Sequence, residues 1–272
     1  MAKKKAAKKE TKSEFLRKVL SKNPNLEYRQ VNQRWAKAGH AGEISNALYY
    51  RVRADLGIRT EWTWVKVSEP TPGPTSPAGT GEVFQFKITL LDSQPAIWRR
   101  IQVKDCTLDE LHEHIQTAMG WTNSHLHHFR INGMPYGDPM LMEETFEELN
   151  YKDSTRTMLS DIIPQRGKGR RFEYEYDFGD SWLHEVLFEG RTRAEPNQQY
   201  PLCLEGARAC PPEDVGGVWS YAVFVEAISD PENEAHDERL EWVGGKFDPE
   251  SFNPAAATKR MRAGLPDWRS MR

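Results

Sequence analysis

The strongest pattern of hydrophobic and polar positions is a period of two over residues 172–178 and 182–188. Aromatic residues alternate with charged ones in FEYEYDF, and one face of WLHEVLF holds Trp182, His184, Val186 and Phe188. This period of two is typical of strands with one buried face, so the two segments are predicted to form an antiparallel hairpin. Gly179 and Asp180 are expected to form a two-residue turn, with Gly179 at positive φ. Such a turn places Asp177 and His184 close to Asp180.

Further alternating segments extend this hairpin into a sheet. VFQFKITLL at residues 83–91 and AIWRRIQV at residues 96–103 are separated by the turn sequence DSQP. They are predicted to form an antiparallel pair. SHLHHFRING at residues 124–133 is a third candidate strand, with His125 and His127 on the same face and a terminal Asn-Gly turn.

Helical patterns lie between these strands. Thr107 and Glu110 form a capping-box motif, which predicts a helix over residues 108–119 that ends at Gly120. Shorter helical patterns are expected at residues 158–163, 219–229 and 234–242 and from Pro254 onward. The predicted fold class is therefore α+β, an antiparallel sheet with packed helices.

Residues 13–56 follow a helical pattern. Apolar spacing predicts helices over residues 13–23, with Ser13 as N-cap, 25–39 and 43–56. This compact tri-helical unit resembles helix-turn-helix DNA-binding folds, whose last helix enters the major groove. On that resemblance, the candidate nucleic-acid-binding residues are Arg34, Lys37, Ser45, Asn46, Tyr50, Arg51 and Arg53. The alternative is a solvated basic face on a small packing module.

Charge divides the chain in two. The net charge of the 272 residues is -3. Residues 1–66 hold 16 Lys/Arg and 6 Asp/Glu, a net of +10, whereas the remainder holds 21 and 34, a net of -13. A basic part joined to an acidic body favours a polyanion such as DNA as a partner, with another protein as the alternative.

Composition marks the domain boundaries. The lysine-rich start has too few apolar residues to fold, and PTPGPTSPAGTGE has the composition of a linker. The expected division is a disordered basic arm (1–12), a tri-helical module (13–67), a Pro/Gly-rich linker (68–82), an α+β domain (83–253) and a C-terminal tail (254–272).

Two further features bear on the compartment. No apolar run approaches the roughly 20 residues that cross a bilayer, so no membrane partner is expected. The three cysteines have no disulfide or zinc-knuckle spacing, which favours ordinary thiols in the cytoplasm.

Imidazole and carboxylate groups gather around the predicted hairpin. They form a candidate site for a divalent metal such as zinc, manganese or iron, made of His125, His127, Asp177, Asp180 and His184. The alternative is that the histidines pack in the aromatic core and the aspartates accept hydrogen bonds from turn N–H groups. Glu213 and Asp214 lie beside a Gly-Gly pair. They either bind a cation or take part in acid–base chemistry, or Asp214 only holds the loop through hydrogen bonds to its backbone.

Several motifs occur in a specific order: IWRRIQV, LHEHIQTAMGW, HLHHF, YEYDFGDSWLHEV, PPEDVGG and KFDPESFN. In this order they resemble the plasmid Ri open-reading-frame-three family over residues 83–253. Some members are labelled transposon resolvase-like. The resemblance implies an α+β domain with an antiparallel sheet and no established activity. The arginine-rich arrangement around a nucleophilic serine that serine recombination needs is not found in the sequence.

These observations predict a two-domain, mobile-element or plasmid-type protein that binds or regulates, with DNA binding through the first module. The alternative is a metal-dependent hydrolase or nuclease that uses the Asp/His cluster. A structural adaptor without chemistry is the third reading. No catalytic residue is assigned.

Overall fold

A computed structural model of the chain describes residues 10–24, 26, 28–40, 42, 44, 48–49, 52–53, 56–58, 81–142, 151–163 and 170–265. The predicted helix over residues 43–56 lies mostly outside these residues, although Leu48, Tyr49, Val52 and Arg53 are helical. The predicted linker is also outside, except for Gly81 and Glu82, and Glu82 already belongs to the first strand.

The N-terminal part contains two helices that contact each other, α1 (Lys12–Lys22) and α2 (Tyr28–Lys37). Helix α1 starts two residues earlier than an N-cap at Ser13 would allow, because Thr11 is its N-cap and forms a full capping box with Glu14. The prediction of Ser13 as N-cap is therefore wrong. The two helices bury a separate apolar cluster that includes Phe15, Leu16, Leu20, Val31 and Trp35.

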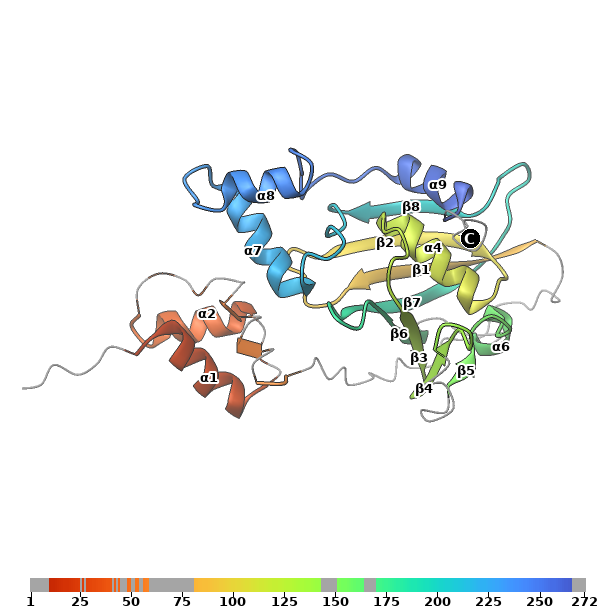
Figure 1. The fold of residues 1–272 in the computed structure, drawn as a ribbon. Coiled ribbons are helices and arrows are strands. Elements are labelled where there is room, and N and C mark those ends of the chain that lie inside the picture. Colours follow the sequence, from red (N-terminus) through yellow and green to blue (C-terminus); the bar gives the residue numbers. More distant parts are fainter. Residues whose placement is uncertain are drawn as a thin grey trace, which may run out of the picture.

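The acidic body is built on one eight-stranded sheet in the order β5-β4-β3-β6-β7-β1-β2-β8 (Figure 1). All neighbours are antiparallel except β4 and β5, which pair in parallel. The strands are β1 (Glu82–Leu90), β2 (Ile97–Lys104), β3 (His127–Ile131), β4 (Met134–Gly137), β5 (Lys152–Asp153), β6 (Arg170–Tyr176), β7 (Trp182–Arg193) and β8 (Leu202–Ala207). The α+β class is confirmed, and the predicted pairs β1–β2 and β6–β7 are present.

Helices α4 (Leu108–Met119) and α9 (Pro254–Ala263) contact each other, α4 against β2 and α9 against β8 (Figure 1). The capping box at Thr107 is present, and Gly120 ends α4 in the left-handed conformation, as predicted. Ala257 and Met261 of α9 are buried in the main core. Residues 254–263 are therefore part of the body and not a tail.

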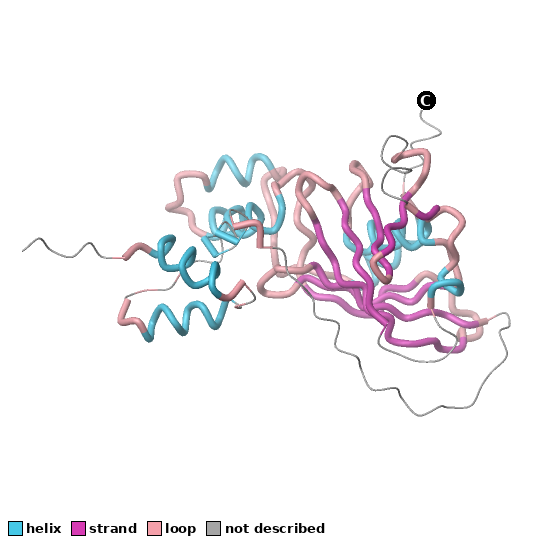
Figure 2. Tube along the Cα trace, turned by 90° about the horizontal axis from the view of Figure 1, so that it is seen from below, coloured by secondary structure: helices cyan, strands magenta, loops and turns pink. Residues whose placement is uncertain are grey.

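The remaining helices are α6 (Leu159–Ile162), α7 (Gly217–Ser229) and α8 (His236–Trp242). Both views place α7 and α8 beyond the same end of the sheet as the N-terminal helices (Figures 1 and 2). None of the helices in the described part of the chain is long and apolar enough to cross a membrane.

The hairpin of β6 and β7 has the predicted pairing but a different turn. Tyr176 pairs with Trp182, so the connection is a five-residue loop rather than a two-residue turn. Positive φ angles occur at Asp177 (57°) and Ser181 (53°), and not at Gly179. The Asp177 side chain accepts hydrogen bonds from the next N–H groups and so forms its own turn, which removes the need for a left-handed glycine.

Candidate functional site

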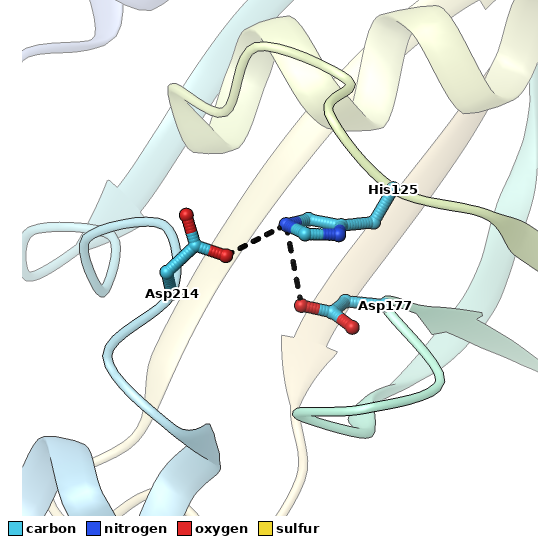
Figure 3. A group of neighbouring side chains, drawn as sticks. All are labelled: His125, Asp177 and Asp214. Atoms are coloured by element: carbon cyan, nitrogen blue, oxygen red, sulfur yellow. Dashed lines mark hydrogen bonds and ion pairs between the residues drawn. The ribbon is translucent and has the colours of Figure 1, made fainter.

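Three loops meet at one end of the sheet: the segment before β3, the hairpin loop after β6, and the loop before α7. Their side chains place the imidazole of His125 between the carboxylates of Asp177 and Asp214 (Figure 3). Nε2 of His125 is 2.9 Å from Oδ1 of Asp214 and 3.5 Å from Oδ2 of Asp177. One ligand atom from each residue lies within 4.8 Å of the other two. We call these three residues the His–Asp–Asp group.

Asp177 is the rigid member of the group. Its side chain is only 9% exposed. Oδ1 accepts hydrogen bonds from the N–H groups of Gly179 (2.9 Å) and Asp180 (3.2 Å). Because these bonds occupy Oδ1, Oδ2 is left facing His125, in the way that outer hydrogen bonds orient a ligating carboxylate.

Asp214 is the exposed member, with a side chain that is 70% accessible. Its loop is nevertheless tied down by its neighbours. Glu213 accepts hydrogen bonds from the Thr122 N–H (2.9 Å) and the Tyr176 hydroxyl (3.1 Å). Burial, and then the nearby charge of Glu213, raise the pKa of Tyr176, so its hydroxyl keeps the proton that it donates.

His125 presents one nitrogen to both carboxylates. Nε2 can interact favourably with two anions only if it carries a proton or binds a cation, because a neutral lone pair would face them otherwise. The ring edge rests against Tyr176, with centroids 5.9 Å apart. A metal ion held here would take the place of that proton.

The donor set suits a divalent metal ion. Imidazole nitrogen and carboxylate oxygen bind zinc, manganese and iron at about 2.0–2.2 Å, which puts ligand atoms about 3–4 Å apart. The separations within the His–Asp–Asp group are close to this range. Small side-chain movements would complete the coordination.

Two predicted ligands, His127 and His184, are not part of this group. Both are buried, and Nδ1 of His184 is 2.9 Å from the Trp182 carbonyl oxygen. Burial lowers the pKa of His184 to about 4 and lowers that of His127 well below its usual value, so both are neutral near pH 7. The strand positions point these rings into the core, whereas the group lies beyond the strand ends.

Asp180 is also outside the group, since its Oδ2 accepts a hydrogen bond from the Gly216 N–H (2.9 Å). It joins the hairpin loop to the loop before α7. His125 itself precedes β3, which begins at His127, so strand alternation does not apply to it. The missing member, Asp214, was identified in the sequence only as a separate loop carboxylate.

A buried network lies behind the group. Nδ1 of His112, on α4, is 2.8 Å from the Tyr174 hydroxyl, and its Nε2 is 2.9 Å from Oδ1 of Asn123. Burial lowers the pKa of His112 to about 3. The sequence signal for this residue was its helical spacing from Leu108, which places it on the inner face of α4. Through Asn123 the network positions the segment that carries His125.

The candidate nucleic-acid residues have different outcomes. Arg34 and Lys37 are exposed in the last turn of α2. Arg53 is buried, and its guanidinium donates hydrogen bonds to the Pro24 carbonyl (2.8 Å) and the Tyr49 hydroxyl (3.3 Å). The prediction that Arg53 faces outward is therefore wrong. The other candidates, Ser45, Asn46, Tyr50 and Arg51, lie outside the described residues.

The fold and the group define an α+β protein with an eight-stranded sheet and a candidate cation site at one end of that sheet. The chain belongs to the plasmid pRiA4b ORF-3-like protein family, whose profile matches residues 82–256. This confirms the resemblance seen in the sequence motifs. The N-terminal helices precede the matched region.

The match to this chain covers most of the length of two relatives. The uncharacterized protein y4hQ of Sinorhizobium fredii is 42% identical over 176 residues, which is 64% of this chain and 86% of that protein. The crystal structure of MM3350, a protein of unknown function from Methanosarcina mazei, is similar with a TM-score of 0.58 and 35% identity. That match covers 65% of this chain and 98% of MM3350.

Proposed function

We propose that this chain is a binding or regulatory protein whose α+β domain takes a divalent metal ion at the His–Asp–Asp group. The observation that supports this is the convergence of His125, Asp177 and Asp214 from three separate loops. Two aspartates and one imidazole nitrogen meet at a partly exposed position, where an ion can enter. The firmly held Asp177 supplies a preorganised oxygen, and the exposed Asp214 can close over the ion.

Metal content and affinity test this proposal directly. Full-length protein is treated with a chelator, incubated with Mn²⁺ or Zn²⁺, desalted and analysed by elemental mass spectrometry, with calorimetry for the affinity. We expect one ion per chain in the wild type. Asp177→Asn and Asp214→Asn should weaken binding at least about tenfold.

The asparagine variants keep the backbone conformation. Both positions have positive φ, 57° and 59°, and asparagine adopts this region nearly as readily as aspartate. The matched control is Asp237→Asn on the exposed surface of α8, which should bind as the wild type does. A wild type that takes up neither ion removes the proposal, and full binding by both variants places the ion elsewhere.

The N-terminal helices supply the candidate surface for DNA. Arg34 and Lys37 are adjacent exposed cations on α2, in a region with a net charge of +10. Each phosphate contact adds about 0.9 to the slope of log affinity against log salt. Fluorescence anisotropy with a mixed-sequence duplex should show steep salt dependence that the double change Arg34→Glu and Lys37→Glu reduces. Lys246→Glu, in the acidic body, is the control and should leave the slope unchanged.

A metal-dependent hydrolase or nuclease is the second candidate. The exposure of Asp214 and His125 means that coordination positions not filled by the protein would face solvent, as catalytic metal sites require. A bound metal would supply a Lewis acid for a phosphoryl or carbonyl oxygen. Cleavage of a phosphodiester reporter by Mn²⁺-loaded protein, lost in Asp177→Asn and retained in Asp237→Asn, would establish it. Equal rates in these two variants would reject it.

A further inference from the structure

The His–Asp–Asp group is adjacent to the start of α7, and α7 contacts the N-terminal helices. Asp214 precedes Gly217, the first residue of α7, by three positions. Trp219, in the first turn, packs against the buried apolar cluster of the N-terminal helices. The same short segment therefore joins the candidate metal site to the basic module.

The start of α7 is held closely against the hairpin loop. The Gly216 N–H donates to Oδ2 of Asp180. A Cβ atom on Gly217 would lie 2.5 Å from the Asp180 carbonyl oxygen, so the two backbones are in direct contact. A shift of the loop before α7 therefore shifts the first turn of α7 as well, since the contact leaves no space to absorb it.

Asp214 is the part of this loop that a cation would affect most. Within the described residues its side chain contacts His125, and it is otherwise solvent-exposed. A single exposed contact of this kind constrains a loop weakly. An ion held by both Asp214 and the buried Asp177 would tie the loop to the body.

We infer that metal binding at the His–Asp–Asp group favours docking of the N-terminal helices on Trp219, so that the α+β domain regulates the basic module according to metal occupancy. This inference rests on the proposed metal site and adds its regulatory output. Coupling between two sites is reciprocal, so docking on Trp219 must raise the metal affinity by the same factor as metal raises docking.

Hydrogen exchange of the full chain tests the coupling. Backbone amides of α1 and α2 around Leu20 and Val31 are followed with and without saturating Mn²⁺, and amides of β1 serve as the internal reference. We expect exchange in α1 and α2 to slow by at least about fivefold, the lower end for coupled sites. Trp219→Ala should abolish this slowing while β1 remains protected.

The reciprocal measurement is the affinity for Mn²⁺. Trp219 is not among the three ligand residues, so a weaker affinity in Trp219→Ala, by the same factor, would come from lost docking. Trp219→Phe keeps an apolar ring and should retain most of the effect, which controls for loss of folding.

The two failures are distinguishable. If the wild type binds Mn²⁺ but exchange in α1 and α2 does not change, the coupling is overturned and the metal site stands. If the wild type binds no metal, both the proposed site and the coupling are rejected. If metal slows exchange equally in the wild type and in Trp219→Ala, Trp219 is not the connection and the inference is wrong.

Discussion

The imidazole rings of His112 and His127 are stacked face to face, with centroids 3.4 Å apart and planes within 3° of parallel. Both rings are buried between α4 and the sheet. Protonation of either ring would place a charge in a buried site next to the other ring. The folded state therefore holds this pair, and the buried His184, in the neutral form.

Stability should fall as the pH drops below about 6.5, the usual pKa of histidine in an unfolded chain. The folded-state pKa is lowered to about 3 for His112 and about 4 for His184. The unfolded chain therefore binds more protons in this window, and stability is fully present above pH 6.5. Each buried histidine should lower the free energy of unfolding by about 1 kcal/mol between pH 6 and pH 5.

Urea unfolding at pH 7, 6 and 5 checks this dependence. His184→Phe removes one titrating group and keeps a ring of similar size, so its free energy of unfolding should lose about 1 kcal/mol less between pH 6 and 5. A free energy of unfolding that is the same at pH 7 and pH 5 would contradict the burial of neutral histidines.

The two adjacent arginines of the IWRRIQV motif should differ in their contribution to stability. Arg99 is 1% exposed and donates to the carbonyl oxygens of Trp98 (2.8 Å), Ala207 (2.9 Å) and Ala118 (3.1 Å). Arg99→Lys should lower the free energy of unfolding by about 2–4 kcal/mol, because one ammonium group cannot reach all three carbonyls.

Arg100 is the matched control, since it points to the opposite face of β2 and pairs with Glu189 at a partly exposed position. Arg100→Lys should cost about 1 kcal/mol or less. Chemical denaturation of both variants gives the comparison. Equal losses of unfolding free energy would show that the hydrogen bonds from Arg99 to three carbonyl oxygens do not stabilise the fold.

Strands β2, β6 and β7 could be predicted from the sequence because buried and partly exposed positions alternate along them. Helix α4 could be predicted because Thr107 and Glu110 form a local capping box. Strand β8 was not predicted, since its sequence LCLEGA has no regular alternation and its pairing with β2 shifts register near Arg100. The position of β8 depends on tertiary contacts with α9.

The candidate site could be predicted only in part. His125 and Asp177 were recognised as possible ligands, because His125 lies on a candidate strand and Asp177 at the end of the predicted hairpin. Asp214 lies 37 positions after Asp177, and no local pattern links the two. Alternation also led to the inclusion of His127 and His184, because a period of two cannot distinguish a ring in the core from a ring in a site.

The capping boxes at Thr107 and Thr11 should report on two separate units. Thr107→Ala removes the side chain that accepts from the Glu110 N–H (3.1 Å) and should destabilise the body by about 1 kcal/mol. Thr11→Ala removes the equivalent bond from the Glu14 N–H (3.2 Å) and should speed hydrogen exchange in α1 alone. If Thr11→Ala lowers the unfolding transition of the body as much as Thr107→Ala does, the predicted domain division is wrong.

The contact between Gly217 and Asp180 gives the sharpest steric test of the loop geometry. Gly217→Ala places a Cβ atom 2.5 Å from the Asp180 carbonyl oxygen at a φ of +80°. Gly133→Ala is an ideal control, because Gly133 has the same φ of +80° and no atom within 4 Å of the added Cβ. The control should lose about 1–2 kcal/mol of unfolding free energy from the left-handed backbone alone.

Gly217→Ala should lose about 1–3 kcal/mol more of unfolding free energy by overpacking. It should also weaken Mn²⁺ binding, since the loop that carries Asp214 must move. Equal stability and equal metal affinity in the two variants would show that the start of α7 is not held against the hairpin loop.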